Sequence, residues 1–220
     1  VLPDPTSVAE ADYLLVESTY GNRVHQADDN GAALARVVVE TAGRGGRIVI
    51  PAFAIGRVEE LLYWLRRLED ERKIPVLPVY VDSPMAVEAL ARYRERLAEL
   101  DPDMQPEARD EKAPHGPADR DEPAEERRRH AHREREICAF CTARFRTIAT
   151  PAESKQLTAS KTPAIVISSS GMATGGRVLH HLKAALPDSR NTVLFAGYQA
   201  EGTRGRQLVE WDSDLLARRE

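Results

Sequence analysis

The sequence is poor in cysteine, with only two among 220 residues. So few cysteines argue against a disulfide scaffold and fit a reducing compartment, from which we expect a cytoplasmic protein. No run of about 18 apolar residues occurs, which argues against a transmembrane helix and against a membrane partner. The opening VLPDPTSV has no basic stretch followed by an apolar one, so no signal peptide is predicted. Because the chain starts without methionine, we expect it to be part of a longer protein.

The chain also lacks an excess of positive charge, since 31 Lys and Arg residues face 35 Asp and Glu residues. Binding to nucleic acid would therefore need local basic clusters instead of a basic surface overall. Charge is concentrated in residues 101–137, which hold 12 acidic and 8 basic residues and five of the 14 prolines. Such a composition predicts a mobile, solvated insertion, with an exposed helix over Ala124–Ile137.

Strand-like and helix-like patterns alternate through the rest of the chain. Short runs of β-branched and other apolar residues predict strands at Tyr13–Val16, Arg47–Phe53, Pro78–Val81, Phe145–Ile148, Ala164–Ser168 and Thr192–Phe195. Apolar residues at helical spacing predict helices over Asp29–Ala42, Gly56–Leu68, Pro84–Leu97, Glu153–Leu157, Gly176–Leu186 and Thr203–Trp211. Repeated strand–helix–strand units predict an α/β fold, a Rossmann-like parallel sheet with helices on both faces.

Glycine, hydroxyl and arginine side chains follow the predicted strands. The carboxyl ends of parallel strands meet at one edge of a sheet, where ligands of α/β proteins bind. Glycine lets the backbone approach a ligand closely, and hydroxyls, guanidinium groups and helix N-termini donate hydrogen bonds to phosphate. The sequence therefore predicts a phosphate-binding rim. It contains neither GxGxxG after its first strand nor GxxxxGK[ST], which disfavours NAD and ATP.

Five sequence blocks carry a resemblance to a known family: VESTYGNRVH (16–25), IPAFAIGRVEELLYWL (50–65), PVYVDSPMA (78–86), ESKQL (153–157) and ISSSGMATGGRVLHHLKAALPDSRNTVLFAGYQAEGTRGR (167–206). On these blocks the chain resembles the β-CASP family, nucleases of the metallo-β-lactamase fold, and within it the RNA-processing branch. The resemblance implies that residues 1–22 are an edge of the metallo-β-lactamase part. Residues 23–100 and 138–211 would form the two halves of the β-CASP domain, with 101–137 as an insertion and 212–220 as a tail.

The resemblance implies a zinc-dependent ribonuclease with two zinc ions in the complete parent enzyme. The family's HxHxDH ligand block does not occur in this sequence, so we expect no zinc in this chain and no hydrolysis by the chain alone. RNA and the missing metallo-β-lactamase part would be its partners, and a homodimer stays open. Glu17 matches a supporting acid beside the metal site of the parent. Our candidates for contacts with RNA phosphates and sugars are Ser168, Ser169, Ser170, Gly171, Thr203, Arg204 and Arg206, with Arg57 as a weaker candidate.

Several of these residues also have simpler interpretations. Glu17 can cap a turn or pair with Arg23, and Ser168–Ser170 can form a helix cap. Arg204 and Arg206 can be ordinary exposed cations at a helix end. Of the adjacent His180 and His181, we expect one to be buried and the other exposed, because neighbouring helical side chains do not converge.

The two cysteines form a C-x-x-C that follows two histidines. His130, His132, Cys138 and Cys141 supply the four ligands that a structural zinc site needs. The simpler interpretation is that the cysteines pack as small apolar residues in front of a strand. Two further classes of function remain open: a non-catalytic nucleic-acid-binding β-CASP subunit, and a small-molecule phosphate-binding α/β domain unrelated to RNA.

Overall fold

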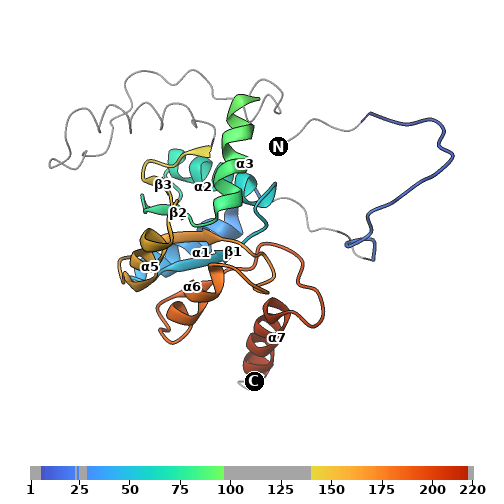
Figure 1. Ribbon diagram of the computed structural model, residues 1–220. Helices are drawn as coiled ribbons and strands as arrows, with labels where there is room; N and C mark the ends of the chain where they lie inside the picture. The colour runs from blue at the N-terminus through green and yellow to red at the C-terminus, as the bar shows by residue number, and fades with distance from the viewer. Residues whose placement is uncertain (1–5, 23, 25–28, 97–139, 218–220) are drawn as a thin grey trace.

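The computed structural model describes residues 6–22, 24, 29–96 and 140–217 (Figure 1). The predicted insertion 101–137, including the helix predicted over Ala124–Ile137, lies outside the described residues. The strands of the described part are β1 (Ile48–Pro51), β2 (Val79–Val81), β3 (Phe145–Thr147), β4 (Ile165–Ser168) and β5 (Thr192–Val193). Its helices are α1 (Ala32–Gly43), α2 (Arg57–Asp70), α3 (Pro84–Glu95), α5 (Pro151–Ala159), α6 (Val178–Ala185) and α7 (Arg204–Ala217).

The five strands form one sheet in the order β3-β2-β4-β1-β5, and every neighbouring pair is parallel. The central strand is β4, whose Ile165 aligns with Ile48 of β1 on one side and with Val79 of β2 on the other. Both β1 and β4 are buried at every position, which explains their continuous apolar sequences. The predicted α/β fold with a parallel sheet is confirmed.

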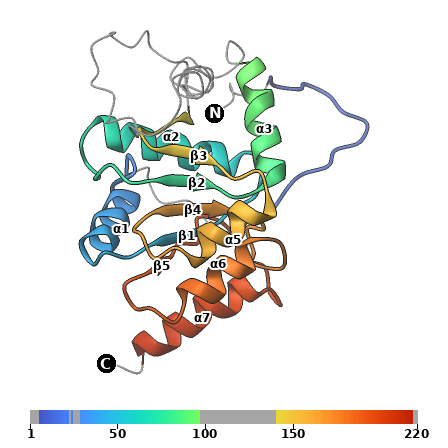
Figure 2. The same ribbon diagram turned by 60° about the vertical axis from the view of Figure 1, so that its left-hand side comes forward.

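Alternate residues of the strands point to opposite faces of the sheet, where buried side chains form one cluster on the first face and two on the other. On one face, Ile50 and Ile167 pack with α1, α2 and α3. On the other face, Val49 packs with α6, and Val166 packs with Leu157 of α5 (Figure 2). The sheet is thus covered on both faces, as the strand–helix alternation predicts.

Two helices begin at caps that the sequence encodes. Thr150 and Glu153 form a reciprocal capping box at the start of α5, where Pro151 occupies the first turn. The Ser83 side chain accepts a hydrogen bond from the Ala86 amide at the start of α3, directly after β2. Among the described residues, no helix has the length and apolarity needed to cross a membrane.

The strand predicted at Tyr13–Val16 is wrong for this structure, which has no strand at these residues. Tyr13, Leu14, Leu15 and Val16 are 91%, 80%, 93% and 69% exposed. A strand needs a neighbour that pairs with its backbone, and this segment extends away from the sheet (Figures 1 and 2). The apolar run is a strand-like sequence without a partner among the described residues.

Candidate nucleic-acid interface

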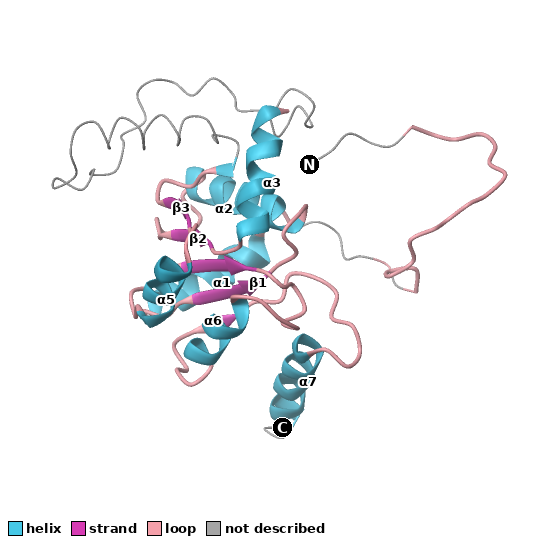
Figure 3. Cartoon of the chain, in the orientation of Figure 1, coloured by secondary structure: helices cyan, strands magenta, loops and turns pink. Residues whose placement is uncertain are grey.

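The loops that follow β1, β2, β4 and β5 meet at the carboxyl edge of the sheet. The Ala52 amide after β1 donates to the Ser168 carbonyl at 3.0 Å, and the Asp82 amide after β2 donates to the Ile167 carbonyl at 2.9 Å. These contacts join the ends of β1 and β2 to the end of β4 between them. The loops drawn in pink between the sheet and α7 in Figure 3 belong to this edge. We call residues 52–57, 168–177 and 197–206 together the rim.

The loop after β4 is fixed by close contacts with the rest of the rim. Gly171 lies so near β1 that a Cβ atom there would come within 2.9 Å of the Phe53 amide nitrogen, so no larger residue fits without movement. The Gly171 carbonyl accepts a hydrogen bond from the buried Gln199 side chain at 3.1 Å. The Gly205 amide, in the first turn of α7, donates to the Met172 carbonyl at 3.0 Å. These contacts tie residues 168–177 to the start of α7.

The three predicted serines have different environments. Ser168 is fully buried, and its hydroxyl donates to the Asp82 carbonyl at 2.7 Å. Its hydroxyl is therefore engaged in the interior, and a contact between Ser168 and a bound phosphate stays a prediction. The Ser169 hydroxyl is also buried and has no partner among the described residues. Ser170 is half-buried and exchanges a hydrogen bond with the Thr174 hydroxyl at 3.1 Å, which leaves it as the serine nearest to solvent.

The predicted arginines differ in whether they already form ion pairs within the chain. Arg204 is exposed and donates a long hydrogen bond of 3.5 Å to the carbonyl of Thr174, the residue that also contacts the Ser170 hydroxyl. Arg206 pairs with Glu210 at 2.6 Å, and Arg57 pairs with Glu60 at 2.7 Å. Both pairs lie within single helices and are partly exposed, so the ion pairs cost little to open.

Thr203 caps α7 instead of facing outward. Its hydroxyl donates to the Ala200 carbonyl at 2.6 Å and accepts a hydrogen bond from the Arg206 amide at 3.2 Å. It therefore positions the helix end that carries Arg204 and Arg206. Arg57 reaches the same region, since a Cβ atom at Gly197 would lie 4.0 Å from its Nε. The structure thus brings Arg57 to the rim, beside the loop after β5.

Glu17 lies on the exposed N-terminal segment, which precedes the sheet in the sequence. Its carboxylate accepts hydrogen bonds from the side chain and the amide of Thr19, and these bonds lower the pKa of Glu17. In this structure Glu17 thus caps a local turn, which is one of its two simpler interpretations. The other, a pair with Arg23, involves a residue that lies outside the described residues. Tyr20 links this segment to the rim, because its hydroxyl accepts a hydrogen bond from the Tyr198 amide at 2.9 Å.

A buried polar cluster behind the rim was not predicted from the sequence. Asp82 follows β2 and is 0% exposed. Its carboxylate accepts hydrogen bonds from Ser154 of α5 and His181 of α6, both at 2.6 Å, and from Arg177 at 2.8 Å. The only feature of the sequence that indicates this cluster is an acidic residue directly after a buried strand. The partners of Asp82 are 72 to 99 residues away in the sequence.

The charge and the hydrogen bonds of this cluster indicate that it has a structural role. Burial raises the pKa of Asp82, but the hydrogen bonds from His181, Ser154 and Arg177 outweigh burial and leave the pKa below its usual value. Ser154 donates to Asp82 and not to a histidine, so it is not activated as a nucleophile. Since the Asp82 carbonyl also holds Ser168, the cluster positions the loop after β4.

Three exposed apolar side chains on or beside the rim were also missed. Phe53, Ile55 and Met85 are 48%, 61% and 63% exposed at the carboxyl ends of β1 and β2. The Phe53 ring lies beside the loop after β4, as its Cδ2 would be 3.0 Å from a Cβ atom at Gly171. Exposed aromatic and apolar groups beside hydrogen-bond donors suit a ligand that has both flat apolar rings and charge.

The predicted histidine and cysteine positions are only partly described. His181 is buried and His180 exposed, which confirms the expected split. Cys141 packs in the core at 8% exposure, whereas His130, His132 and Cys138 lie outside the described residues. Among the residues that the structure describes, no three His, Cys, Asp or Glu side chains are grouped as a metal site requires. The described residues therefore do not supply the ligands of a zinc pair.

Comparisons with known proteins are consistent with the geometry. A Beta-Casp domain matches residues 58–208. A ribonuclease of Thermus thermophilus is 33% identical over 210 residues, covering 95% of this chain and 42% of that protein. An RNase J-like protein of Methanocaldococcus jannaschii is 30% identical over 98% of this chain and 44% of its own length. The transcription termination factor FttA of the same organism is 32% identical over 89% of this chain and 27% of its own length. The chain thus spans less than half the length of these relatives.

Proposed function

The chain belongs to the β-CASP family, and on this basis we propose that it is the RNA-contacting part of a ribonuclease of the metallo-β-lactamase fold. The family contains proteins named as ribonucleases, and RNA phosphodiester hydrolysis is the activity we propose for the complete protein. In this proposal the zinc ions are held by the part of the protein that this chain does not include. The chain alone is expected not to hydrolyse RNA.

The observation that carries the proposal is the rim itself. Arg57 and Arg204 begin α2 and α7, and Ser170 lies in the loop after β4, so three separate segments bring these side chains to one edge of the parallel sheet. Arg204 is exposed, and the pairs that hold Arg57 and Arg206 are partly exposed. Guanidinium and hydroxyl groups in such an arrangement bind phosphate oxygens and position a strand without reading its sequence.

Phe53, Ile55 and Met85 complete the proposed interface. Bases of single-stranded RNA are unstacked and can lie on exposed aromatic or apolar side chains while the backbone meets the cations. Paired bases are hidden in a duplex, so this combination favours single-stranded RNA. Stacking of this kind tolerates every base, which agrees with phosphate contacts that carry no sequence information.

The N-terminal segment has a proposed role in the complete protein. The exposed apolar run Tyr13–Val16 has a strand-like sequence, and we propose that it pairs with strands of the metallo-β-lactamase part. Such pairing would bury four apolar side chains and carry Glu17 toward the metal site, where it would support the metal ligands. A cytoplasmic location stays a prediction from the sequence, and a homodimer stays open.

Replacing Arg204 tests the proposed interface. Arg204→Ala is expected to weaken binding of the 220-residue chain to single-stranded RNA about tenfold, because one charged phosphate contact is lost. The slope of log affinity against log salt concentration should become shallower by about 0.7, the value for one phosphate contact on a single strand. Fluorescence anisotropy with a labelled oligonucleotide at several salt concentrations measures both quantities.

The matched control is Lys73→Ala. Lys73 follows the end of α2, which runs from the rim back to the opposite edge of the sheet, and it forms an exposed ion pair with Glu71 at 2.7 Å. The proposal requires Lys73→Ala to leave the affinity and the salt slope near their original values. Equal losses in both variants would mean that the chain attracts RNA only by its general charge, and the rim would not be the interface.

A second candidate function comes from the same comparisons. Relatives of similar identity are named as transcription termination factors, so this chain can serve RNA binding in a protein whose role is termination. Both candidates require RNA on the rim. RNA hydrolysis by the complete protein, compared before and after substitution of its metal ligands, distinguishes the two candidates.

A further inference from the structure

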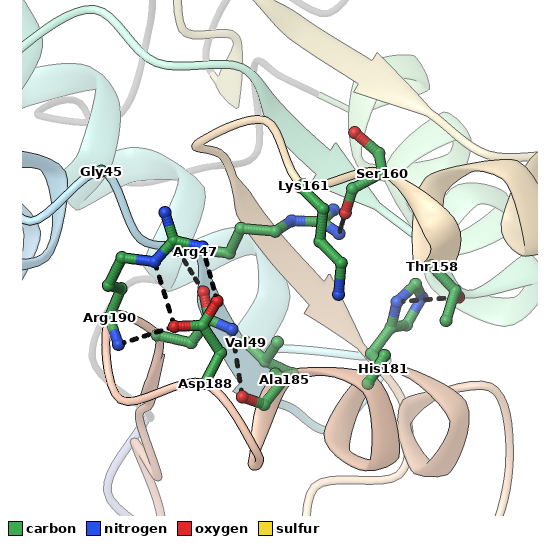
Figure 4. A pocket seen from close by; sticks show the side chains of 12 residues that line it. Gly45, Arg47, Val49, Thr158, Ser160, Lys161, His181, Ala185, Asp188 and Arg190 are labelled. Carbon is green, nitrogen blue, oxygen red and sulfur yellow. Dashed lines mark hydrogen bonds and ion pairs between the residues drawn. The ribbon is translucent and has the colours of Figure 1, made fainter.

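A small cavity lies at the amino edge of the sheet, where β1, β4 and β5 begin (Figure 4). Its volume of about 10 Å³ suits one atom of the size of a water oxygen. Arg47, Lys161, Asp188, Arg190 and His181 line it, together with apolar groups such as Val49 and Ala185. The cavity is thus a polar pocket on an apolar base, and it lies at the opposite end of the strands from the rim.

Arg47 is a buried cation with unused donors in this cavity. Its residue is only 8% exposed, and its Nη1 donates to the Leu157 and Ser160 carbonyls at 2.8 and 2.7 Å. Its Nε and Nη2 atoms are buried and have no partner among the described residues. Nearly all buried polar groups are hydrogen-bonded, and an unpaired buried charge is especially unfavourable. The two unused donors therefore point to a missing acceptor.

The charge around the cavity favours an anion as that acceptor. Three cationic side chains line it, Arg47, Lys161 and Arg190, against a single carboxylate. That carboxylate, Asp188, is already engaged by Arg190 through contacts of 2.7 and 3.1 Å. These hydrogen bonds lower the pKa of Asp188 to about 2, so it is ionised at neutral pH and pairs with Arg190. Lys161 also interacts with Asp188 through its charge, whereas Arg47 has no carboxylate partner among the described residues of this pocket.

The position of Lys161 completes the donor set. Lys161 is exposed at the mouth of the cavity, and Figure 4 shows its side chain extending into the space between Arg47, Asp188 and His181. An anion between Arg47 and Lys161 would meet a fixed guanidinium on one side and an adaptable ammonium on the other. Guanidinium groups match the geometry of phosphate oxygens, and lysine supplies a compact point charge.

We propose that this cavity binds a phosphate group at a site separate from the rim. One phosphate oxygen fills the enclosed space and accepts from Nε and Nη2 of Arg47, because that space holds one atom of this size. The remaining oxygens stay at the mouth, within reach of Lys161. The phosphate comes from inorganic phosphate or from a phosphate ester such as a nucleotide, since both present the same oxygens.

The test is the thermal stability of the 220-residue chain in rising inorganic phosphate, compared with chloride at equal ionic strength. Bound phosphate stabilises the folded state, so the melting temperature should rise until the site is saturated. Lys161→Met should weaken the apparent phosphate affinity about tenfold, and Arg47→Met should abolish the response. Lys155→Met removes an exposed cation from α5 that does not line the cavity, and it should respond as the unmodified chain does.

Adenosine monophosphate as a second probe distinguishes the sources. A response equal to that of inorganic phosphate supports a phosphate ester as ligand, and no response to the nucleotide supports free phosphate. The proposal is overturned if chloride stabilises the chain as much as phosphate does, or if Lys161→Met leaves the phosphate response unchanged. It is also overturned if Arg204→Ala removes the response while Lys161→Met keeps it, because the phosphate would then bind at the rim.

Discussion

Replacement of Asp82 by asparagine is expected to lower the free energy of unfolding by about 3 kcal/mol. The Asp82 carboxylate is fully buried and accepts hydrogen bonds from Arg177, His181 and Ser154. Asparagine keeps the shape but removes the negative charge and places a donor where acceptors are needed, so Arg177 loses its buried counter-charge. Urea unfolding followed by circular dichroism measures the change.

Asp70→Asn is the matched control for this substitution. Asp70 forms an ion pair with Arg66 at 3.3 Å on the surface of α2, where the carboxylate side chain is 48% exposed. An exposed pair of this kind contributes at most about 1 kcal/mol. If Asp82→Asn destabilises the chain no more than Asp70→Asn, the cluster is not the anchor of the rim.

The same cluster predicts how stability depends on pH. The pKa of Asp82 lies below its usual value in the folded state, so its contribution is present above the unfolded pKa of about 3.9 and disappears as pH falls through the folded value. The difference in melting temperature between the unmodified chain and Asp82→Asn should therefore be constant from neutral pH down to about pH 5, and shrink below about pH 4. A difference that does not change at acid pH would assign the effect to shape instead of charge.

Gly46→Ala is expected to destabilise the chain by about 3 kcal/mol or more. A Cβ atom at this position would lie 1.7 Å from the Arg190 carbonyl oxygen and 2.4 Å from its carbon. The neighbouring backbone cannot retreat, because the Arg47 amide donates to the Asn191 side chain and the Arg47 carbonyl accepts from the Thr192 amide, both at 2.8 Å. Relief of the clash requires β5 to separate from β1, and thermal or urea unfolding would show the loss.

Gly43→Ala provides the comparison within the same turn. Gly43 ends α1, and a Cβ atom there meets nothing within 4 Å. Alanine should therefore be neutral or stabilise the chain by up to about 1 kcal/mol, because it restricts the unfolded chain and favours helix. A similar destabilisation in both variants would show that the turn tolerates no side chain at all, and the close contact with Arg190 would not be the cause.

The sequence was sufficient to predict the sheet and its covering helices. Runs such as Ile48–Pro51 and Ile165–Ser168 are apolar at nearly every position because both faces of a central parallel strand are buried. The polar strand ends could also be placed at one edge, since parallel strands end on the same side. The family block ISSSGMATGG (167–176) also marks the loop after β4 in the sequence.

The remaining features depend on contacts between distant parts of the chain. The bond between Asp82 and His181 joins residues 99 positions apart, and no local pattern shows that the two side chains meet. The Ser168 side chain points inward because its hydroxyl donates to the backbone carbonyl of Asp82. A run of serines in the sequence does not reveal this contact. Tyr13–Val16 has the composition of a strand, but composition does not supply the neighbour with which a strand must pair.

The most direct test of the central proposal is the affinity of the 220-residue chain for single-stranded RNA of increasing length, measured at several salt concentrations. A rim that binds the RNA backbone predicts affinity that rises with each added phosphate until the rim is covered, and that falls steeply as salt increases. Binding that is already saturated by a mononucleotide, with no gain from longer RNA, would contradict the proposal and indicate a small-molecule phosphate-binding domain instead.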